Sequence, residues 1–132
     1  MAQENVEIVT RAFEVAQEDP EAFFSIFDQN VEWDMSGAGL PDAKTSYGPE
    51  GVREFFRHWI GPFDDWAYEA EEIIDAGESV IVLLHQWGRG KGSGVVVESR
   101  FWQVWTLRGG KVVHFESFPD KGRALEAAGL QE

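Results

Sequence analysis

The stretch 95–118 limits the possible folds most, because it has the pattern of one long β-hairpin. Gly109 and Gly110 form its turn, and adjacent glycines can take positive φ angles without the steric clash that a Cβ atom causes. We predict a three-residue loop with Gly110 in the left-handed conformation. This loop sets the cross-strand pairs Leu107 with Lys111, Trp105 with Val113, Gln103 with Phe115, and Phe101 with Ser117. A two-residue turn would shift this pairing by one residue.

Side chains alternate along a strand, so the hairpin has two faces of different chemistry. One face carries rings, amides and hydroxyls: Val97, Ser99, Phe101, Gln103, Trp105, Val113, Phe115 and Ser117. The other face carries the charges: Glu98, Arg100, Trp102, Val104, His114, Glu116 and Phe118. We expect the first face to point inward. If Val82 and Leu84 of the preceding strand also point inward, that strand adds Gln86 to the inner face.

The rest of the chain reads as helices followed by strands. Periodicity and capping residues predict helices over 3–17, from Pro20 to near Asp28, from Gly48 to Gly61, and after Asp120. Alternating segments predict strands over 31–34, 66–75 and 79–88, and the segment 35–48 reads as a long loop. Helices segregated from an antiparallel sheet indicate an α+β fold.

The acidic composition excludes several classes of partner. The 132 residues carry 24 acidic and 11 basic side chains, a formal net charge of -13, which repels phosphate backbones and anionic lipid. We therefore expect no nucleic-acid partner and no membrane partner. The sequence has no cysteine, no leader-like segment after Met1, and no apolar run near the roughly 20 residues of a membrane span. We expect a cytoplasmic protein and a single domain over residues 1–132.

Several motifs together carry a resemblance to a known family. They are Val31-Glu32-Trp33 after two helices, the segment 47–55 at the start of the third helix, the segment 104–112 at the hairpin, and Asp120 with Ala124-Leu125 at the end. In this order and spacing they resemble the SnoaL-like branch of the nuclear transport factor 2 (NTF2-like) superfamily, which includes ketosteroid isomerases, polyketide cyclases and dehydratases. The resemblance spans essentially the whole chain. It implies a cone-shaped α+β barrel, in which a strongly curved antiparallel sheet wraps around the N-terminal helices and encloses an apolar cavity.

The resemblance also indicates where catalytic groups would lie. Enzymes of this superfamily work with a carboxylate or histidine inside the cavity, where burial tunes its pKa. The isomerases place a base aspartate where this chain has Trp33, and the SnoaL-type cyclases place an acid/base His and Asp at positions that match Gln103 and Ser117. None of these three side chains titrates near neutral pH. The departure from the family pattern favours ligand binding over proton transfer.

Three other side chains are candidates for chemistry. Asp34 is a candidate base at the cavity mouth, and a solvated strand-end residue is the alternative reading. Tyr47 is a candidate hydrogen-bond donor to a bound carbonyl, and a packing ring is the alternative. His58 lies beside the apolar stripe of the third helix, where a surface histidine is the favoured reading.

We predict no metal and no cofactor. His58, His85 and His114 are far apart in the sequence, and no HExxH spacing is present. The glycine-rich segment 88–94 leads from a strand into a strand rather than into a helix, which disfavours a phosphate-binding loop.

Three functions stay open at this stage. The first is binding of a small hydrophobic molecule under the loop 35–48, by Trp33, Tyr47, Phe55, Trp59, Gln86, Phe101, Gln103, Trp105, Phe115 and Ser117, although the rings would also suit a plain core. The second is an isomerase-, cyclase- or dehydratase-type enzyme acting on a steroid-, polyketide- or terpene-like substrate, with Asp34 and Tyr47 as catalytic residues. The third is a homodimeric scaffold that packs through the outer sheet face, by Trp87, Arg100, Trp102, His114 and Glu116, unless the terminal helix covers these rings.

Overall fold

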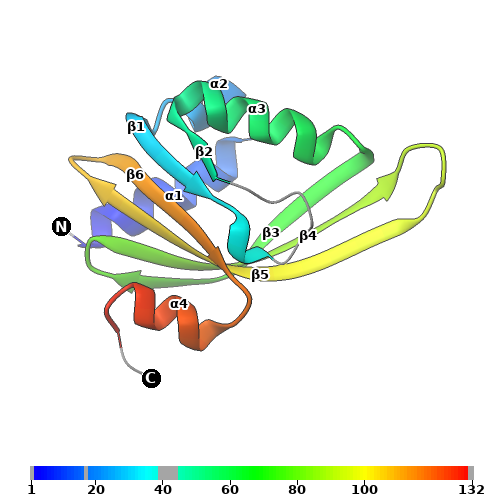
Figure 1. The fold of residues 1–132 in the computed structure, drawn as a ribbon. Helices are drawn as coiled ribbons and strands as arrows, with labels where there is room; N and C mark the ends of the chain where they lie inside the picture. Colours follow the sequence, from blue (N-terminus) through cyan, green and yellow to red (C-terminus); the bar gives the residue numbers. More distant parts are fainter. Residues whose placement is uncertain (1, 17, 39–44, 131–132) are drawn as a thin grey trace.

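The computed structural model describes residues 2–16, 18–38 and 45–130. In chain order its elements are α1 (Ala2–Val15), α2 (Pro20–Phe24), β1 (Phe27–Asp34), the short 3-10 helix η1 (Ser36–Ala38), β2 (Thr45–Tyr47), α3 (Gly48–Ile60), β3 (Phe63–Ala76), β4 (Ser79–Gly90), β5 (Val96–Arg108), β6 (Lys111–Phe118) and α4 (Lys121–Ala127). The predicted α+β class is confirmed. Helices α3 and α4 lie on opposite sides of the sheet (Figure 1).

The helix boundaries follow from side-chain caps and from glycine and proline. The carboxylates of Asp19 and Asp120 accept hydrogen bonds from backbone N–H groups in the first turns of α2 and α4. Gly48 opens α3 with a φ of 71°, a left-handed value that a residue without a Cβ adopts at little cost. No helix among the described residues is long and apolar enough to cross a membrane.

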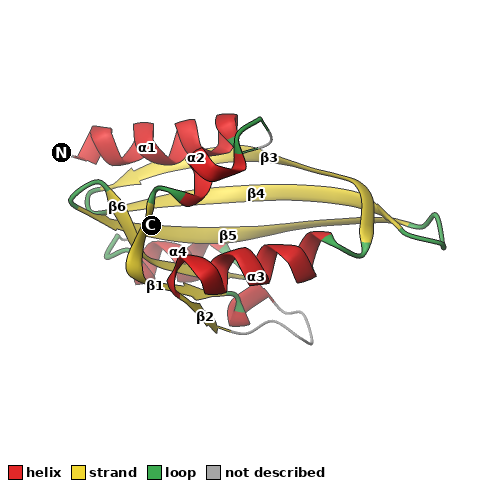
Figure 2. Ribbon diagram, turned by 90° about the horizontal axis from the view of Figure 1, so that it is seen from above, coloured by secondary structure: helices red, strands yellow, loops and turns green. Residues whose placement is uncertain are grey.

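The sheet differs from the expected closed antiparallel cone. Its six strands run in the order β2-β1-β6-β5-β4-β3, and β1 is parallel to β6 while all other neighbours are antiparallel. A parallel pair needs a long crossover, and here α3 and four strands, β2 to β5, separate β1 from β6 in the chain. The sheet is not closed into a barrel, since β2 and β3 are its two free edges. Helix α1 lies along β3 and α3 lies along β1, with the long strands between them (Figure 2).

The predicted pairing of the last hairpin is wrong by two residues. The turn contains only Gly109 and Gly110, because Arg108 pairs with Lys111, and a bulge then shifts the register between Thr106 and Leu107. Beyond the bulge Trp105 pairs with Phe115 and Gln103 with Ser117. A shift of two leaves each side chain on its predicted face, since the strand period is also two.

Two residues of the hairpin do depart from their predicted face or environment. Val113 is the extra residue of the bulge and leaves the inner face, where Val112 takes its place against Leu107. Val97 is 47% exposed, near the projecting end of the β4–β5 hairpin (Figure 1). The expected inward direction of Gln86 is confirmed, because Val82, Leu84 and Gln86 pair with inner residues of β5.

Two hydrophobic clusters cover the two faces of the sheet. The main one joins the inner face to α1, α2 and α3, and its largest fully buried side chains are Trp105 and Phe115. The second joins Ile81 and Val104 on the outer face to Ala124 and Leu125 of α4. The terminal helix therefore covers part of the outer face, and the three N-terminal helices cover the inner one.

Candidate functional site

A cavity of about 810 Å³ lies between the concave face of the sheet and the N-terminal helices. Its walls come from the end of α1, from α2, α3, β3, β4 and β5. The lining residues are Phe13, Ala16, Pro20, Phe23, Phe24, Met35, Arg53, Phe55, Phe56, Arg57, Trp59, Ile60, Gly61, Trp66, Tyr68, Leu84, Gln86, Phe101 and Gln103. The volume is in the range of cavities that hold drug-sized molecules.

Aromatic side chains form most of the cavity wall. Helix α3 contributes Phe55 and Trp59, whose rings stack at a centroid distance of 5.1 Å, and Trp59 meets Phe101 of β5 edge to face at 6.4 Å. Trp66 and Tyr68 stand two residues apart on β3, with ring centroids 5.1 Å from each other. Such a wall gains free energy mainly by taking the apolar surface of a ligand out of water.

Gln103 is the most deeply buried polar residue of the wall. Its side chain is 4% exposed, and its Oε1 accepts a hydrogen bond of 2.9 Å from Nε1 of Trp105. An indole N–H can only donate, so this bond fixes which end of the amide is the oxygen. The Nε2 of Gln103 has no hydrogen-bond partner among the described residues. The amide of this lining residue therefore keeps both N–H groups of Nε2 and one lone pair of Oε1 for further hydrogen bonds.

Gln86 is held in a different way, at both ends of its amide. Its Oε1 accepts from Nε1 of Trp59 at 2.9 Å, and its Nε2 donates to Oγ of Ser99 at 3.0 Å. The first bond connects α3 to β4, and the second connects β4 to β5. Gln86 thus ties the helix to the sheet at the cavity wall.

Two arginines of α3 supply the only full charges among the described lining residues. The guanidinium of Arg53 donates a bidentate pair of hydrogen bonds to the carboxylate of Glu21, both at 2.8 Å. Its Cζ lies 4.5 Å from the centre of the Phe24 ring. This guanidinium lowers the pKa of Glu21 through its hydrogen bonds and its charge. Arg57 pairs with Glu54 at 2.7 Å and is largely exposed. Both cations are therefore already paired at the rim.

No described lining residue of the cavity is Asp, Glu or His. Tyr68 is the one neutral group there that can lose a proton, and burial raises its pKa above the ordinary value of 10.0. Its hydroxyl donates to the carbonyl of Phe13 at 2.9 Å. Near neutral pH the wall consequently offers hydrogen bonds and apolar contact, and no group that exchanges a proton readily.

The structure divides the predicted ligand-binding residues into three sets. Phe55, Trp59, Gln86, Phe101 and Gln103 line the cavity. Trp33, Trp105, Phe115 and Ser117 are buried behind its wall, where the rings of Trp33 and Phe115 stack at 3.7 Å. Tyr47 is 67% exposed and stands at the N-cap of α3, outside the lining. The loop predicted as a lid lies partly outside the described residues, since these include 35–38 and 45–48 only.

Asp34 lies on the opposite side of β1 from the cavity. It alternates with Trp33 and Met35, which are buried on the inner side, and its cross-strand partner is Glu116. Burial by itself raises the pKa of Asp34, but hydrogen bonds from Ser36 and Thr45, with the charge of His114, outweigh that effect and lower it. The catalytic roles of Asp34 and Tyr47 stay predictions, and neither side chain is among the cavity-lining residues.

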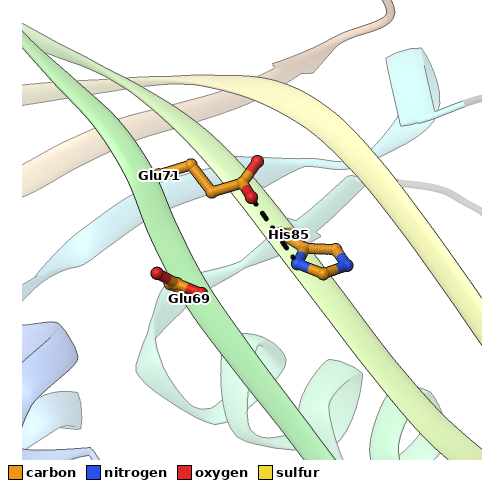
Figure 3. Close-up of side chains that lie close together, drawn as sticks. All are labelled: Glu69, Glu71 and His85. Atoms are coloured by element: carbon orange, nitrogen blue, oxygen red, sulfur yellow. Dashed lines mark ion pairs between the residues drawn. The ribbon is translucent and has the colours of Figure 1, made fainter.

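A group of metal-ligand type lies on the outer face of the sheet, away from the cavity. The side chains of Glu69, Glu71 and His85 converge there from β3 and β4 (Figure 3), and their ligand atoms lie within 4.8 Å of one another. Arg100 already donates to both carboxylate oxygens of Glu71, at 2.8 and 3.3 Å, and lowers the pKa of Glu71 chiefly through these bonds. His85 also contacts Glu98 at 2.9 Å. The group is organised as an ion-pair network around a guanidinium.

The remainder of the predicted dimer surface is partly covered. Trp102 packs in the cluster under α4, and Nζ of Lys121 lies 5.5 Å from the centre of its ring. The rings of Trp87 and His85 lie 4.6 Å apart at a tilt of 37°, and His114 contacts Glu32 and Glu116. Homodimer formation through this face stays a prediction.

The sequence analysis missed the contribution of the first two helices and of β3 to the wall. Phe13, Ala16 and Phe23 were read only as the apolar sides of the first two helices, and neither Phe24 nor Tyr68 was singled out. A signal was present for β3, because Trp66 and Tyr68 are rings two residues apart on a strand and share a face. No comparable signal exists for α1 and α2, whose apolar stripes look alike whether they face a core or a cavity.

Comparison with known proteins places this chain in a family. The SnoaL-like domain matches residues 9–115. The chain belongs to the SnoaL-like domain family. This SnoaL-like protein has no significant match among curated proteins.

Solved structures show the same fold. An NTF2-like protein from Burkholderia thailandensis E264 is 30% identical, with a TM-score of 0.78 over 88% of this chain and 90% of that one. TerC, co-crystallised with polyporic acid, is 22% identical, with a TM-score of 0.74 over 96% and 98% of the two chains. A hypothetical protein with a ketosteroid isomerase-like fold from Catenulispora acidiphila, in complex with trimethylamine, is 18% identical, with a TM-score of 0.71 over 94% and 93%. The last two similarities concern the fold alone.

Proposed function

We propose that this SnoaL-like protein binds a small, mainly apolar and aromatic molecule in the cavity between α3 and the inner face of β4 and β5. The observation that carries the proposal is the composition of the wall. Nine of its described lining residues are aromatic, and none is a carboxylate or a histidine. Such a wall holds a flat apolar molecule by burial and ring contact, at about 25 cal/mol for each Å² removed from water.

Two further features support binding over proton transfer. The buried polar groups of the wall, Gln86 and Gln103, are amides, which orient a ligand but do not titrate. The charges of Arg53 and Arg57 are paired with glutamates at the rim. TerC, a protein of the same fold, was co-crystallised with a small organic molecule, which makes polyporic acid a reasonable first probe.

The direct test is thermal unfolding in the presence of a ligand panel. The panel contains fluorene, 9-fluorenone, a steroid ketone and polyporic acid. A ligand that binds only the folded state stabilises it by about 2.7 kcal/mol at 100 times its Kd, which raises the midpoint by several degrees. If no member of the panel changes the midpoint, the proposal is wrong.

A pair of matched variants shows where such a ligand binds. Ala16 lines the cavity, whereas Ala127 is exposed at the end of α4. Ala16→Trp puts an indole into the cavity and is expected to abolish the ligand-induced shift. Ala127→Trp adds the same group outside and is expected to leave that shift unchanged. Equal effects of the two variants would place the binding site elsewhere.

The enzyme alternative has its own test. Steroid, polyketide and terpene substrates are tested for turnover by the wild type, Asp34→Asn and Tyr47→Phe. Catalysis is favoured if turnover disappears in either variant while the same substrate still raises the unfolding midpoint. We expect binding without turnover.

A further inference from the structure

Three side chains of metal-ligand type meet across the β3–β4 strand pair, on the face of the sheet away from the cavity. Glu69 and Glu71 supply two carboxylates and His85 an imidazole, and one ligand atom of each lies within 4.8 Å of the others (Figure 3). His85 is the cross-strand partner of Glu69. No other group of this kind occurs in the described part of the chain. The set combines nitrogen and oxygen ligands, as zinc sites do.

An irregularity of the β3–β4 ladder brings Glu71 into this group. Ala70 pairs with Leu84 and Glu72 pairs with Leu83, so Glu71 is the extra residue of a bulge. A bulge leaves its extra residue unpaired in the ladder and redirects the side chain. Strand β3 is also an edge strand, with β4 as its only neighbour in the sheet. The group therefore lies where the ladder that holds the edge strand is interrupted, and an ion bound to both strands would connect them there.

The two nitrogens of His85 face different carboxylates. Nε2 lies 2.9 Å from Oε2 of Glu98 on β5, and Nδ1 lies 3.7 Å from Oε2 of Glu71. An ionised carboxylate can only accept a hydrogen bond, so Glu98 favours the tautomer with the proton on Nε2 and leaves a lone pair on Nδ1. Between that lone pair and the oxygen of Glu71 only a cation is stable, either a second proton or a metal ion. Histidines that bind metals are commonly oriented by a carboxylate on their other nitrogen.

The spacing of the ligand atoms suits a small divalent ion. Two ligands at about 2.1 Å from a tetrahedral ion lie about 3.4 Å apart, close to the 3.7 Å between Nδ1 of His85 and Oε2 of Glu71. Arg100 holds Oε1 of Glu71 at 2.8 Å and Oε2 at 3.3 Å, so the oxygen that faces His85 is the more weakly held one. Glu69 is exposed and forms no ion pair with another described residue. A rotation of its side chain completes a set of three ligands.

We infer that Glu69, Glu71 and His85 bind a zinc ion, which connects the edge strand β3 to β4. Imidazole together with carboxylates favours a late first-row divalent ion over Mg²⁺ and Ca²⁺, which prefer oxygen ligands alone. The carboxylates of the group, with that of Glu98 included, outweigh the guanidinium of Arg100. Sequence analysis predicted no metal from spacing along the chain, whereas these ligands are neighbours only across a strand pair. The site is separate from the cavity, so its test and that of the proposed function fail independently.

The test is a titration of tag-free protein with ZnCl2, measured by isothermal titration calorimetry and by thermal unfolding. We expect one zinc ion per chain, and an unfolding midpoint that rises by several degrees at about 100 times the dissociation constant. EDTA should return the midpoint to its starting value. The inference is overturned if no stoichiometric binding is found at zinc concentrations up to about 1 mM.

A matched pair of histidine variants locates the ion. His85→Gln removes the imidazole of the proposed site, and zinc affinity should fall at least tenfold. His114→Gln is the control, because His114 also lies between two carboxylates, 3.0 Å from Glu32 and 3.2 Å from Glu116, on other strands. Its zinc affinity should equal that of the wild type. Undiminished binding in His85→Gln, or an equal loss in both variants, would overturn the assignment. Glu69→Gln, at an exposed position, carries the same prediction if His85→Gln does not fold.

Glu98 is a positioning residue in this site, since it contacts His85 and not the ion. Glu98→Ala should weaken zinc binding about tenfold, and Glu98→Gln should restore most of the affinity, because an amide oxygen accepts the same hydrogen bond from Nε2. The visible absorption spectrum of bound Co²⁺ reports the ligands of the ion and should keep its shape in Glu98→Ala. A merely structural role of Glu98 would instead lower the unfolding midpoint of the zinc-free protein in step with zinc affinity. Unchanged zinc affinity in Glu98→Ala would contradict the inferred orientation of His85.

Discussion

The two faces of the β4–β5 strand pair differ in the chemistry of their side chains. On the inner face Leu84, Gln86 and Gln103 meet rings and other neutral groups. On the outer face His85 and Arg100, which are direct neighbours of inner residues in the chain, meet carboxylates. Strand alternation thus keeps a histidine and an amide one residue apart in different environments. Distance along the sequence says little about which groups can act together on a ligand.

The two faces also differ in what holds them together. The inner face depends on burial of large rings, each of which contributes through removed apolar surface and ring contact. The part of the outer face that α4 does not cover depends on ion pairs that water and salt reach, and such pairs contribute little individually. Substitutions on the inner face should therefore change stability and ligand affinity, whereas substitutions in these outer ion pairs should change neither strongly.

The largest expected effect is the loss of a buried inner ring. Phe115→Ala removes a fully buried ring that stacks on Trp33 at 3.7 Å, and we expect it to lower the free energy of unfolding by about 3 to 5 kcal/mol. The matched variant is Phe118→Ala, which removes the same atoms from a half-buried ring under α4. Urea unfolding should show a clearly smaller loss for Phe118→Ala. Equal losses would remove the energetic distinction between the faces.

A smaller effect is expected when one carboxylate of the outer network is neutralised. Glu71→Gln removes the negative charge beside Arg100 and His85, and one of the two oxygens that accept hydrogen bonds from Arg100. We expect a small fall in the thermal midpoint that becomes smaller in high salt, and no change in the affinity for fluorene. Glu126→Gln on α4 removes the same charge, and no ion pair involves Glu126 in the described part of the chain. A change in fluorene affinity in Glu71→Gln alone would connect the outer network to the cavity.

The smallest effect concerns the dependence of stability on pH. The pKa of Asp34 is lowered from its ordinary value of 3.8 in the folded protein, so its carboxylate stabilises the fold above that value. This contribution is lost as the pH falls through the lower folded-state pKa. In urea unfolding between about pH 7 and pH 2, the difference between wild type and Asp34→Asn should be constant at the upper end and shrink below about pH 4.

A second substitution tests the cause of that pKa shift. Ser36→Ala removes the hydroxyl that donates to Oδ1 of Asp34 at 2.6 Å. The pKa of Asp34 should then move back toward its ordinary value, and the fall in stability at acid pH should become less steep. If the fall in stability at acid pH is equally steep in Ser36→Ala, the pKa shift of Asp34 has another origin.

The sequence predicted the faces of the sheet better than its pairing. Gln86 and Gln103 were expected inside and Trp87 outside, because alternation is a local property of each strand. The hairpin register was wrong because the chain accommodates its extra residue in a bulge at Val113 instead of in the turn. Nothing local to β1 or β6 indicated that they pair in parallel, since this contact joins segments about eighty residues apart.

The candidate site was predicted in part for a similar reason. The apolar stripe of α3 and the inner face of the hairpin indicated one wall of a cavity, and both contribute lining residues. The opposite wall is formed by Phe13, Phe23 and Tyr68, which come from three separate elements and meet only in the folded chain. The bond from Trp105 that orients Gln103 depends on rotamers, which sequence periodicity does not specify.

A crystal structure of the protein grown with 9-fluorenone tests most directly whether the cavity binds a molecule through neutral groups alone. The account predicts that the rings lie between α3 and the inner face of β4 and β5. A ligand on the outer face of the sheet, or one contacted in the cavity by an Asp, Glu or His side chain, would contradict it.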